Sequence, residues 1–200
     1  MATLRGRPYY QIISALKQMD MKYYSVSPQE AAASDAKIII TTHDEASLIA
    51  NRKGSVIFDT ELEKYPAVAK AKILRSIVGE QADDQMVIGI DPGSRIGVSV
   101  IYMHEEIAST VESSPAQTVE KISAILAGVS SRKKVVRIGD GNMMMAQQLA
   151  WLVKKRFNAV QVEIVDEHGT SQNTEANRRG IRDRSSARTI AFRSGKSFQL

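Results

Sequence analysis

Three consecutive runs rich in β-branched residues, joined by very short connections, constrain the fold of this chain more than any other feature. The runs lie at Met86–Asp91, Arg95–Tyr102 and Glu106–Glu112, and Pro92-Gly93-Ser94 and Met103-His104-Glu105 separate them. Parallel strands need a crossover of about a dozen residues or more, so these connections allow antiparallel pairing alone. The sequence therefore predicts a three-stranded meander.

After the meander the hydrophobic period alternates between helix and strand. Right-handed crossovers would place the first, fourth and fifth strands side by side and parallel, with the second and third strands antiparallel beyond the first. The predicted order is βββαβαβα, an α/β fold with a mixed five-stranded sheet. Its later elements are a helix opening at Ser114-Pro115, a strand at Lys134–Gly139, a helix at Asn142–Arg156, a strand at Val160–Val165 and a helix at Arg178–Arg193.

A polar stretch, Gly79–Gln85, opens with a glycine able to end a helix and marks a domain boundary. We expect a small α/β accessory domain over residues 1–79 and a second domain over residues 86–194. In the first domain, Ala36–Thr41 and Val56–Phe58 read as short strands and Pro66–Val78 as a helix. His43-Asp44-Glu45 follows the first of these strands, and such a run is more typical of a loop or helix cap than of a metal site.

Composition excludes several classes of protein. The 200 residues are 43% hydrophobic and 24% charged, which is typical of a folded, soluble chain. There is no cysteine, so disulfides, thiolate-zinc sites and cysteine nucleophiles are excluded. No apolar run approaches the roughly 20 residues that span a bilayer, so we expect a cytoplasmic protein with no membrane partner.

Basic residues favour a polyanionic partner. The formal net charge is +5, and arginines crowd into the last predicted helix, where Asp183 is nearly the only acid. A solvated helix face is the alternative reading of this cluster. The residues that would contact nucleic acid are Arg178, Arg179, Arg182, Arg184 and Arg188, with Ser94 and Arg95 from the first turn.

Aspartates stand at the carboxyl ends of the three strands predicted to be parallel. Asp91, Asp140 and Asp166 end the first, fourth and fifth strands, and Asp183 lies near the start of the last helix. Adjacent strands are about 4.8 Å apart, so carboxylates at neighbouring ends can share a cation, and Mg²⁺ prefers such oxygen ligands. The alternatives are strand-end aspartates that accept backbone N–H bonds and, for Asp183, an ion pair with Arg179.

Several motifs, in order along the chain, resemble a known superfamily. Ile88–Gly97, with the sequence IGIDPGSRIG, resembles the first-strand motif of the RuvC Holliday junction resolvases. Val165-Asp166-Glu167 with Thr170-Ser171 resembles the fifth-strand motif of the related YqgF (RuvX) family. The last helix carries an aspartate, a small residue three and four positions on, and an aliphatic at seven, as in that family: Asp183, Ser186, Ala187 and Ile190.

This resemblance covers about residues 86–193 and implies a ribonuclease-H-like fold, a magnesium or manganese cofactor and cleavage of structured nucleic acid. Carried over, it makes Asp91, Asp140 and Asp183 metal ligands, with Asp166 a fourth candidate catalytic acid. RuvC resolvases usually carry glutamate at the fourth-strand position, where this chain has Asp140, so the subfamily stays open.

The leading hypothesis is therefore a metal-dependent endonuclease acting on branched DNA or structured RNA. A non-catalytic nucleic-acid-binding module with the same fold is the alternative. The actin and sugar-kinase ATPases share the fold but need it duplicated, commonly in well over 300 residues. A junction resolvase would also need two active sites, and hence a homodimer.

Overall fold

The computed structural model describes residues 1–50, 54–79, 84–167 and 179–199, and the chain divides into two compact units, Met1–Ala82 and Asp83–Leu200. The division falls inside the polar stretch noted above. Each unit is described by itself. Among the described residues, every helix is too short or too polar to cross a membrane.

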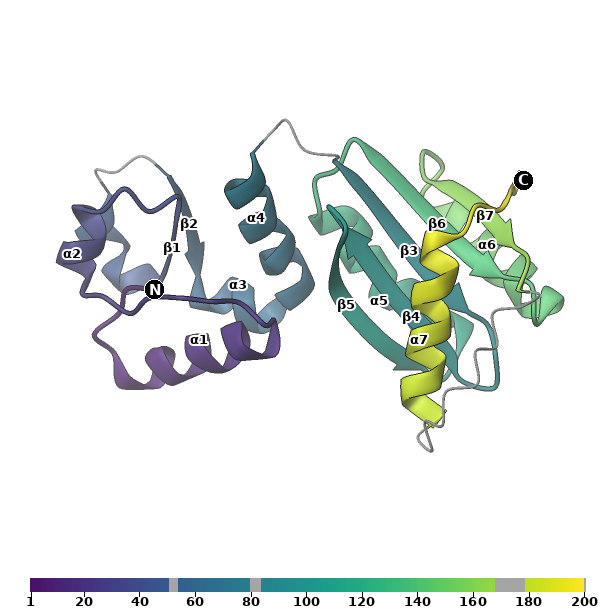
Figure 1. The fold of residues 1–200 in the computed structure, drawn as a ribbon, viewed down its shortest axis with the longest axis horizontal. Helices are drawn as coiled ribbons and strands as arrows, with labels where there is room; N and C mark the ends of the chain where they lie inside the picture. Colours follow the sequence, from purple (N-terminus) through teal and green to yellow (C-terminus); the bar gives the residue numbers. More distant parts are fainter. Residues whose placement is uncertain (51–53, 80–83, 168–178, 200) are drawn as a thin grey trace. The chain divides into compact units, whose positions relative to one another are not determined.

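The second unit is built on a six-stranded mixed sheet with the strand order β5-β4-β3-β6-β7-β8 (Figure 1). β3 pairs antiparallel with β4 and parallel with β6, β4 pairs antiparallel with β5, and β6 pairs parallel with β7. This is the predicted ribonuclease-H-like arrangement, which is confirmed. The strands are β3 (Gln85–Asp91), β4 (Ile96–Tyr102), β5 (Glu105–Glu112), β6 (Lys133–Gly139), β7 (Gln161–Val165) and β8 (Lys196–Ser197).

Two details of the sheet differ from the sequence prediction. The short strand β8 adds an antiparallel edge to β7, because the chain turns back after the last helix. β5 begins at Glu105 rather than Glu106, since the hairpin turn is the two-residue pair Met103-His104, both with positive φ. Such a pair matches the tight turn whose twist suits two antiparallel strands.

Three helices cover the sheet on two sides. α7 lies across one face, against β3 and β4, while α5 and α6 lie on the other (Figure 1). Each begins close to the predicted position: Ser114 and Asn142 accept hydrogen bonds from the backbone of the first turns of α5 and α6. The bounds are α5 (Pro115–Gly128), α6 (Met143–Arg156) and α7 (Arg179–Phe192).

The backbone of α7 approaches the sheet unusually closely because two strand residues lack side chains. A Cβ at Gly89 would overlap the backbone of Ala187, and a Cβ at Gly97 would overlap the carbonyl oxygen of Asp183. The opposing face of α7 is small and apolar, with Ala187, Ile190 and Ala191 buried. Glycine in a strand often marks such an approach of another backbone.

A buried ion pair fastens the far end of α7 to the sheet. Arg137 Nε of β6 lies 2.8 Å from Glu163 Oε2 of β7, and Arg137 also donates to the carbonyl of Ala191 at 2.8 Å. Glu163 accepts a further hydrogen bond from Gln161. The side chains of the pair are 15% and 10% exposed, so the partners satisfy charges that would be costly alone.

The first unit is a small α/β layer around the parallel pair β1 and β2. Ala2 forms a parallel bridge with Val26 and donates to Ile40 O, so the first residues extend this sheet. Glu45 accepts hydrogen bonds from Thr3, Thr42 and the backbone of Leu4, so its side chain fastens the first residues of the chain to the segment that follows β1. Its elements are α1 (Gly6–Gln18), α2 (Pro28–Ala32), β1 (Ile38–Thr41), η1 (His43–Ile49), β2 (Ser55–Phe58), α3 (Asp59–Lys64) and α4 (Pro66–Val78).

Candidate functional site

Asp91 and Asp183 come together because of strand register. Asp91 is the last residue of β3, and its antiparallel partner on β4 is Gly97. The missing side chain at Gly97 admits the Asp183 carbonyl of α7, so the two aspartates lie at the same corner of the sheet. Alternation along β3 turns Asp91 to the same face as Gly89, which is the face under α7. Ser186, one turn after Asp183, donates a hydrogen bond to the Asp91 carboxylate.

Burial and neighbouring charge shift the protonation of Asp91. Desolvation, followed by the negative charges of Glu167 and Asp183, raises the pKa of Asp91 to about 6. The hydrogen bond from Ser186 and the positive charge of Arg182 oppose this shift. Three carboxylates from β3, the segment after β7 and α7 therefore interact electrostatically.

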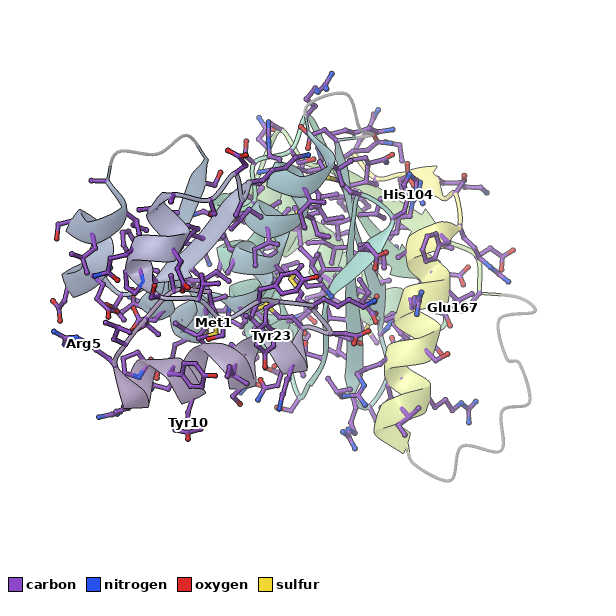
Figure 2. The ribbon with its side chains drawn as sticks, turned by 60° about the vertical axis from the view of Figure 1, so that its left-hand side comes forward. Met1, Arg5, Tyr10, Tyr23, His104 and Glu167 are labelled. Atoms are coloured by element: carbon purple, nitrogen blue, oxygen red, sulfur yellow. The ribbon has the colours of Figure 1, made fainter. Side chains whose placement is uncertain are left out.

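Glu167 is the acid that the sequence analysis did not select. Its carboxylate occupies space left by two glycines: a Cβ at Gly139 would overlap Glu167 Oε1, and a Cβ at Gly141 would lie 2.6 Å from Glu167 Oε2. In Figure 2 Glu167 lies alongside α7. Burial, with the charge of Asp140, raises the pKa of Glu167 against the opposing hydrogen bond from Gly141. The sequence feature that could have pointed to Glu167 was the pair of glycines on either side of Asp140.

Asp140 and Asp166 have different surroundings. Asp140 Oδ1 accepts the backbone N–H of Glu167 at 3.0 Å, so Asp140 holds the segment that follows β7, as the strand-end alternative described. Asp166 is exposed, and its carbonyl oxygen accepts a hydrogen bond from Arg193 at 3.0 Å. Of the neighbours Asp166 and Glu167, Glu167 is the one whose charge helps to raise the pKa of Asp91.

Asp183 is the third acid of this corner, and one of its carboxylate oxygens, Oδ2, is buried. Asp183 Oδ2 accepts no hydrogen bond from any residue that the structure describes. Its charged neighbour is Arg95, whose Nε lies 3.9 Å away, beyond hydrogen-bonding distance. The predicted partner, Arg179, has a side chain outside the described residues. Burying a carboxylate oxygen without a hydrogen-bond donor costs folding free energy, and a bound cation would offset that cost.

The predicted basic residues divide into three groups. Ser94 and Arg95 are exposed in the turn that follows Asp91, so they border the acids. Three exposed arginines project from α7: Arg182, Arg184 and Arg188. Arg178 and the side chain of Arg179 lie outside the described residues, as do Thr170 and Ser171 of the fifth-strand motif.

The carboxylate oxygens of Asp91, Glu167 and Asp183 are chemically suited to a hard cation, although the described side chains do not surround one. Carboxylate oxygens are the ligands that Mg²⁺ and Mn²⁺ take, and the Asp183 oxygen has no competing hydrogen bond within the described residues. In the same part of the chain, however, no three acidic or histidine side chains converge closely enough to hold a metal ion as they stand. Loading would require side-chain rotation of Asp91, Asp183 or Glu167.

Comparisons with known proteins give only distant structural similarities. No protein-family model and no curated protein matches the chain. A crystal structure of Marinitoga piezophila Argonaute in complex with 5′ OH guide RNA is 9% identical, with a TM-score of 0.27, over 82% of this chain and 38% of that one. Another, with guide RNA and target DNA, is 8% identical with a TM-score of 0.29, at the same coverages. This chain thus spans well under half the length of the Argonaute chain. The low TM-scores say nothing about the candidate site.

Proposed function

We propose that the second unit is a metal-dependent nuclease domain that hydrolyses phosphodiesters in structured nucleic acid, either branched DNA or structured RNA. The observation that carries the proposal is the electrostatic interaction of Glu167 and Asp183 with Asp91 at one corner of the sheet, with an Asp183 oxygen that has no hydrogen-bond donor among the described residues. Such a group of acids is costly for a fold to keep unless a cation is bound there.

Each acid has a distinct part in this proposal. Asp91 and Asp183 supply carboxylate oxygens from a rigid strand end and a closely packed helix, while Ser186 orients the Asp91 carboxylate. Glu167 supplies the third carboxylate, and Asp140 fixes the backbone that carries it. A bound pair of Mg²⁺ or Mn²⁺ ions would stabilise the attacking and leaving oxygens of the phosphodiester. The exposed arginines would hold the flanking phosphates.

The first test is cleavage of a labelled four-way DNA junction, a matching duplex and a structured RNA with Mg²⁺, with Mn²⁺ or with chelator. We expect metal-dependent cutting of a structured substrate. Asp91→Asn and Asp183→Asn should each lower the rate at least about a hundredfold, because each removes a ligand that acts in the transition state. Cutting that persists in chelator, or in Asp91→Asn, would contradict the assignment.

Neighbouring residues provide a matched control for the third acid. Glu167→Gln should reduce cleavage as strongly as Asp91→Asn, because the Glu167 side chain is turned toward Asp91. Asp166→Asn should retain most of the activity, since Asp166 is exposed. Loss of cleavage in Asp166→Asn but not in Glu167→Gln would instead assign the catalytic role to Asp166.

A non-catalytic nucleic-acid-binding module is the second candidate. It is favoured by the lack, among the described residues, of three acids or histidines close enough together to hold a metal. Tight binding of a substrate without cutting under every metal condition would select this function.

A further inference from the structure

We propose that the outer face of α6 binds an unpaired stretch of nucleic acid, with one base stacked on the ring of Trp151 and an adjacent phosphate held by Lys155. The inference rests on the proposed function for the class of ligand, and it adds a feature of the substrate, which is a single-stranded segment beside the candidate site. The helix concerned lies on the face of the sheet opposite α7 (Figure 1).

The outer face of α6 carries an exposed stripe of side chains. The inner side of the helix is buried against the sheet: Ala146, Leu149, Ala150 and Val153. On the other side, steps of three or four residues join side chains that are all exposed: Met144, Gln148, Trp151 and Lys155. Met144 is 84% exposed and Trp151 is 47% exposed, so solvent reaches an aromatic ring on this face. These four residues are called the outer stripe of α6.

The ring of Trp151 has a positive charge beside it. Lys155, about one turn further along the helix, places its Nζ 4.7 Å from the centre of the ring, within the range of a cation–π contact. Lys154 is turned elsewhere, because its Nζ donates to the carbonyl oxygens of Asn158 and Val160 at 3.1 and 3.2 Å. An aromatic ring with an adjacent cation is the pair of groups that binds a base and its phosphate in single-strand recognition.

The charge of α6 favours a polyanion as the occupant of the stripe. The helix contains no acidic residue and ends in three basic ones, Lys154, Lys155 and Arg156. A protein partner matches the stripe less well, because a tryptophan side chain buries at most about 250 Å². A stable protein interface buries about 800 Å² on each partner. A base needs the face of one ring, and stacking of this kind accepts every base.

The outer stripe leads toward the candidate site. α6 begins at Met143, and a Cβ at Gly141, two residues earlier, would lie 2.6 Å from Glu167 Oε2, so the start of the helix borders that acid. Met144 and Trp151 are separated by about 10 Å along the helix axis, which is the rise of about three stacked nucleotides. A strand lying on the stripe would therefore reach the corner of the sheet within a few nucleotides.

The fluorescence of Trp151, the single tryptophan, reports directly on the stripe. In the full-length protein with chelator, which prevents metal-dependent cutting, oligodeoxythymidylate or oligouridylate of about 12 nucleotides should quench this fluorescence. A DNA duplex of the same length should quench it much less, because its bases are already stacked on one another. Anisotropy of the labelled oligonucleotide measures binding in parallel, and unquenched fluorescence at saturation would overturn the proposal.

Four variants test the two contacts separately. Trp151→Ala should weaken oligonucleotide binding about five- to a hundredfold, whereas Trp151→Phe keeps a stacking ring and should stay within about threefold of the wild type. Lys155→Gln should lower the slope of log K against log salt by about 0.7, the value for one phosphate of a single strand. Arg156→Gln removes the same charge about 100° around the helix from Lys155, off the stripe, and should leave the slope unchanged. Wild-type affinity in Trp151→Ala would overturn the proposal.

The remaining outcomes separate this inference from other occupants and from the proposed function. A dimer seen by sedimentation without nucleic acid, with blue-shifted Trp151 emission and lost in Trp151→Ala, would assign the stripe to a contact between copies and overturn the proposal. Quenching by single strands in a protein that never cuts would support the stripe and contradict the nuclease. Metal-dependent cutting with unchanged Trp151 fluorescence would support the nuclease and overturn the stripe.

Discussion

At one corner of the sheet, the surroundings of a single residue, Asp91, raise the free energy of its charged form. Asp91 is half-buried beside Glu167 and Asp183, and this environment raises its pKa to about 6. The folded protein therefore binds a proton at Asp91 more tightly than the unfolded chain, in which an aspartate titrates near about 3.9. The contribution of Asp91 to folding stability is therefore greatest below that lower value and is lost as the pH rises through the window up to about 6.

Asp91→Asn should remove this pH-dependent loss. At about pH 8 in chelator, the variant should be more stable than the wild type by roughly 1 to 2 kcal/mol, after allowance for solvent screening, whereas near pH 4 the two should differ little. Urea unfolding followed by the fluorescence of Trp151, the single tryptophan, reports on the second unit. An equal loss of stability in Asp91→Asn at both pH values would argue against a raised pKa.

At the scale of elements, the packing of α7 decides whether the acids meet. Ala187, Ile190 and Ala191 lie on one stripe of α7 with Asp183, and these three are buried. The fold adds that Gly89 and Gly97 let the backbone of this helix touch the sheet. That approach depends on pairs of residues about ninety positions apart.

Gly89→Ala should therefore destabilise the second unit by about 2 kcal/mol or more, because the new Cβ would overlap the backbone of Ala187, which cannot rotate away. Gly180→Ala is the matched control. Its Cβ would meet the flexible end of Arg95, and alanine favours helix, so stability should not fall. The same Trp151 unfolding measurement checks both, and equal stability of Gly89→Ala and the wild type would disprove the close packing.

At the scale of the whole molecule, the sign and distribution of charge bear on the partner. The chain carries a net charge of +5, yet three of its acids, Asp91, Glu167 and Asp183, interact at one corner of the sheet. Exposed Arg182, Arg184 and Arg188 project from α7, the helix that also carries Asp183. Under the proposed function, this basic helix would hold a polyanion while metal ions occupy the acidic corner.

Replacing Arg182, Arg184 and Arg188 by alanine should weaken nucleic-acid binding and flatten its salt dependence. With duplex DNA each lost phosphate contact lowers the slope of log K against log salt by about 0.9, so the three together should lower it by up to about 2.7. Titrations at several salt concentrations measure this slope. The control removes three charges elsewhere on the second unit, at Lys121, Lys133 and Arg156, and an equal change there would show that net charge alone matters.

Most of the architecture followed from local patterns in the chain. Alternating β-branched runs, short turns and helical stripes are properties of adjacent residues, so they predicted the order of the elements from β3 to α7 and their bounds to within one residue. Asp91, at the end of the first strand of the meander, could be selected on the same grounds. The edge strand β8 could not, because two residues carry no periodicity and pair where the chain happens to return.

The distinction between Asp166 and Glu167 depended on the fold. Both follow the same buried strand, and no pattern in the chain says which side chain turns toward Asp91. The hydrogen bond from Glu167 N to Asp140, together with the space above Gly139 and Gly141, decides it. The fold likewise brings Arg95 from a distant turn to within 3.9 Å of Asp183, whereas the expected pair of Asp183 with Arg179 involves a side chain outside the described residues.

The order of residues alone thus specified a βββαβαβα chain with acids at its strand ends, because secondary structure and burial depend on periodicities that a linear sequence displays. Tertiary structure alone decided which acids influence one another and how closely the backbone of α7 approaches the sheet. Those properties arise from register and from close backbone contact, and both depend on residues far apart in the chain.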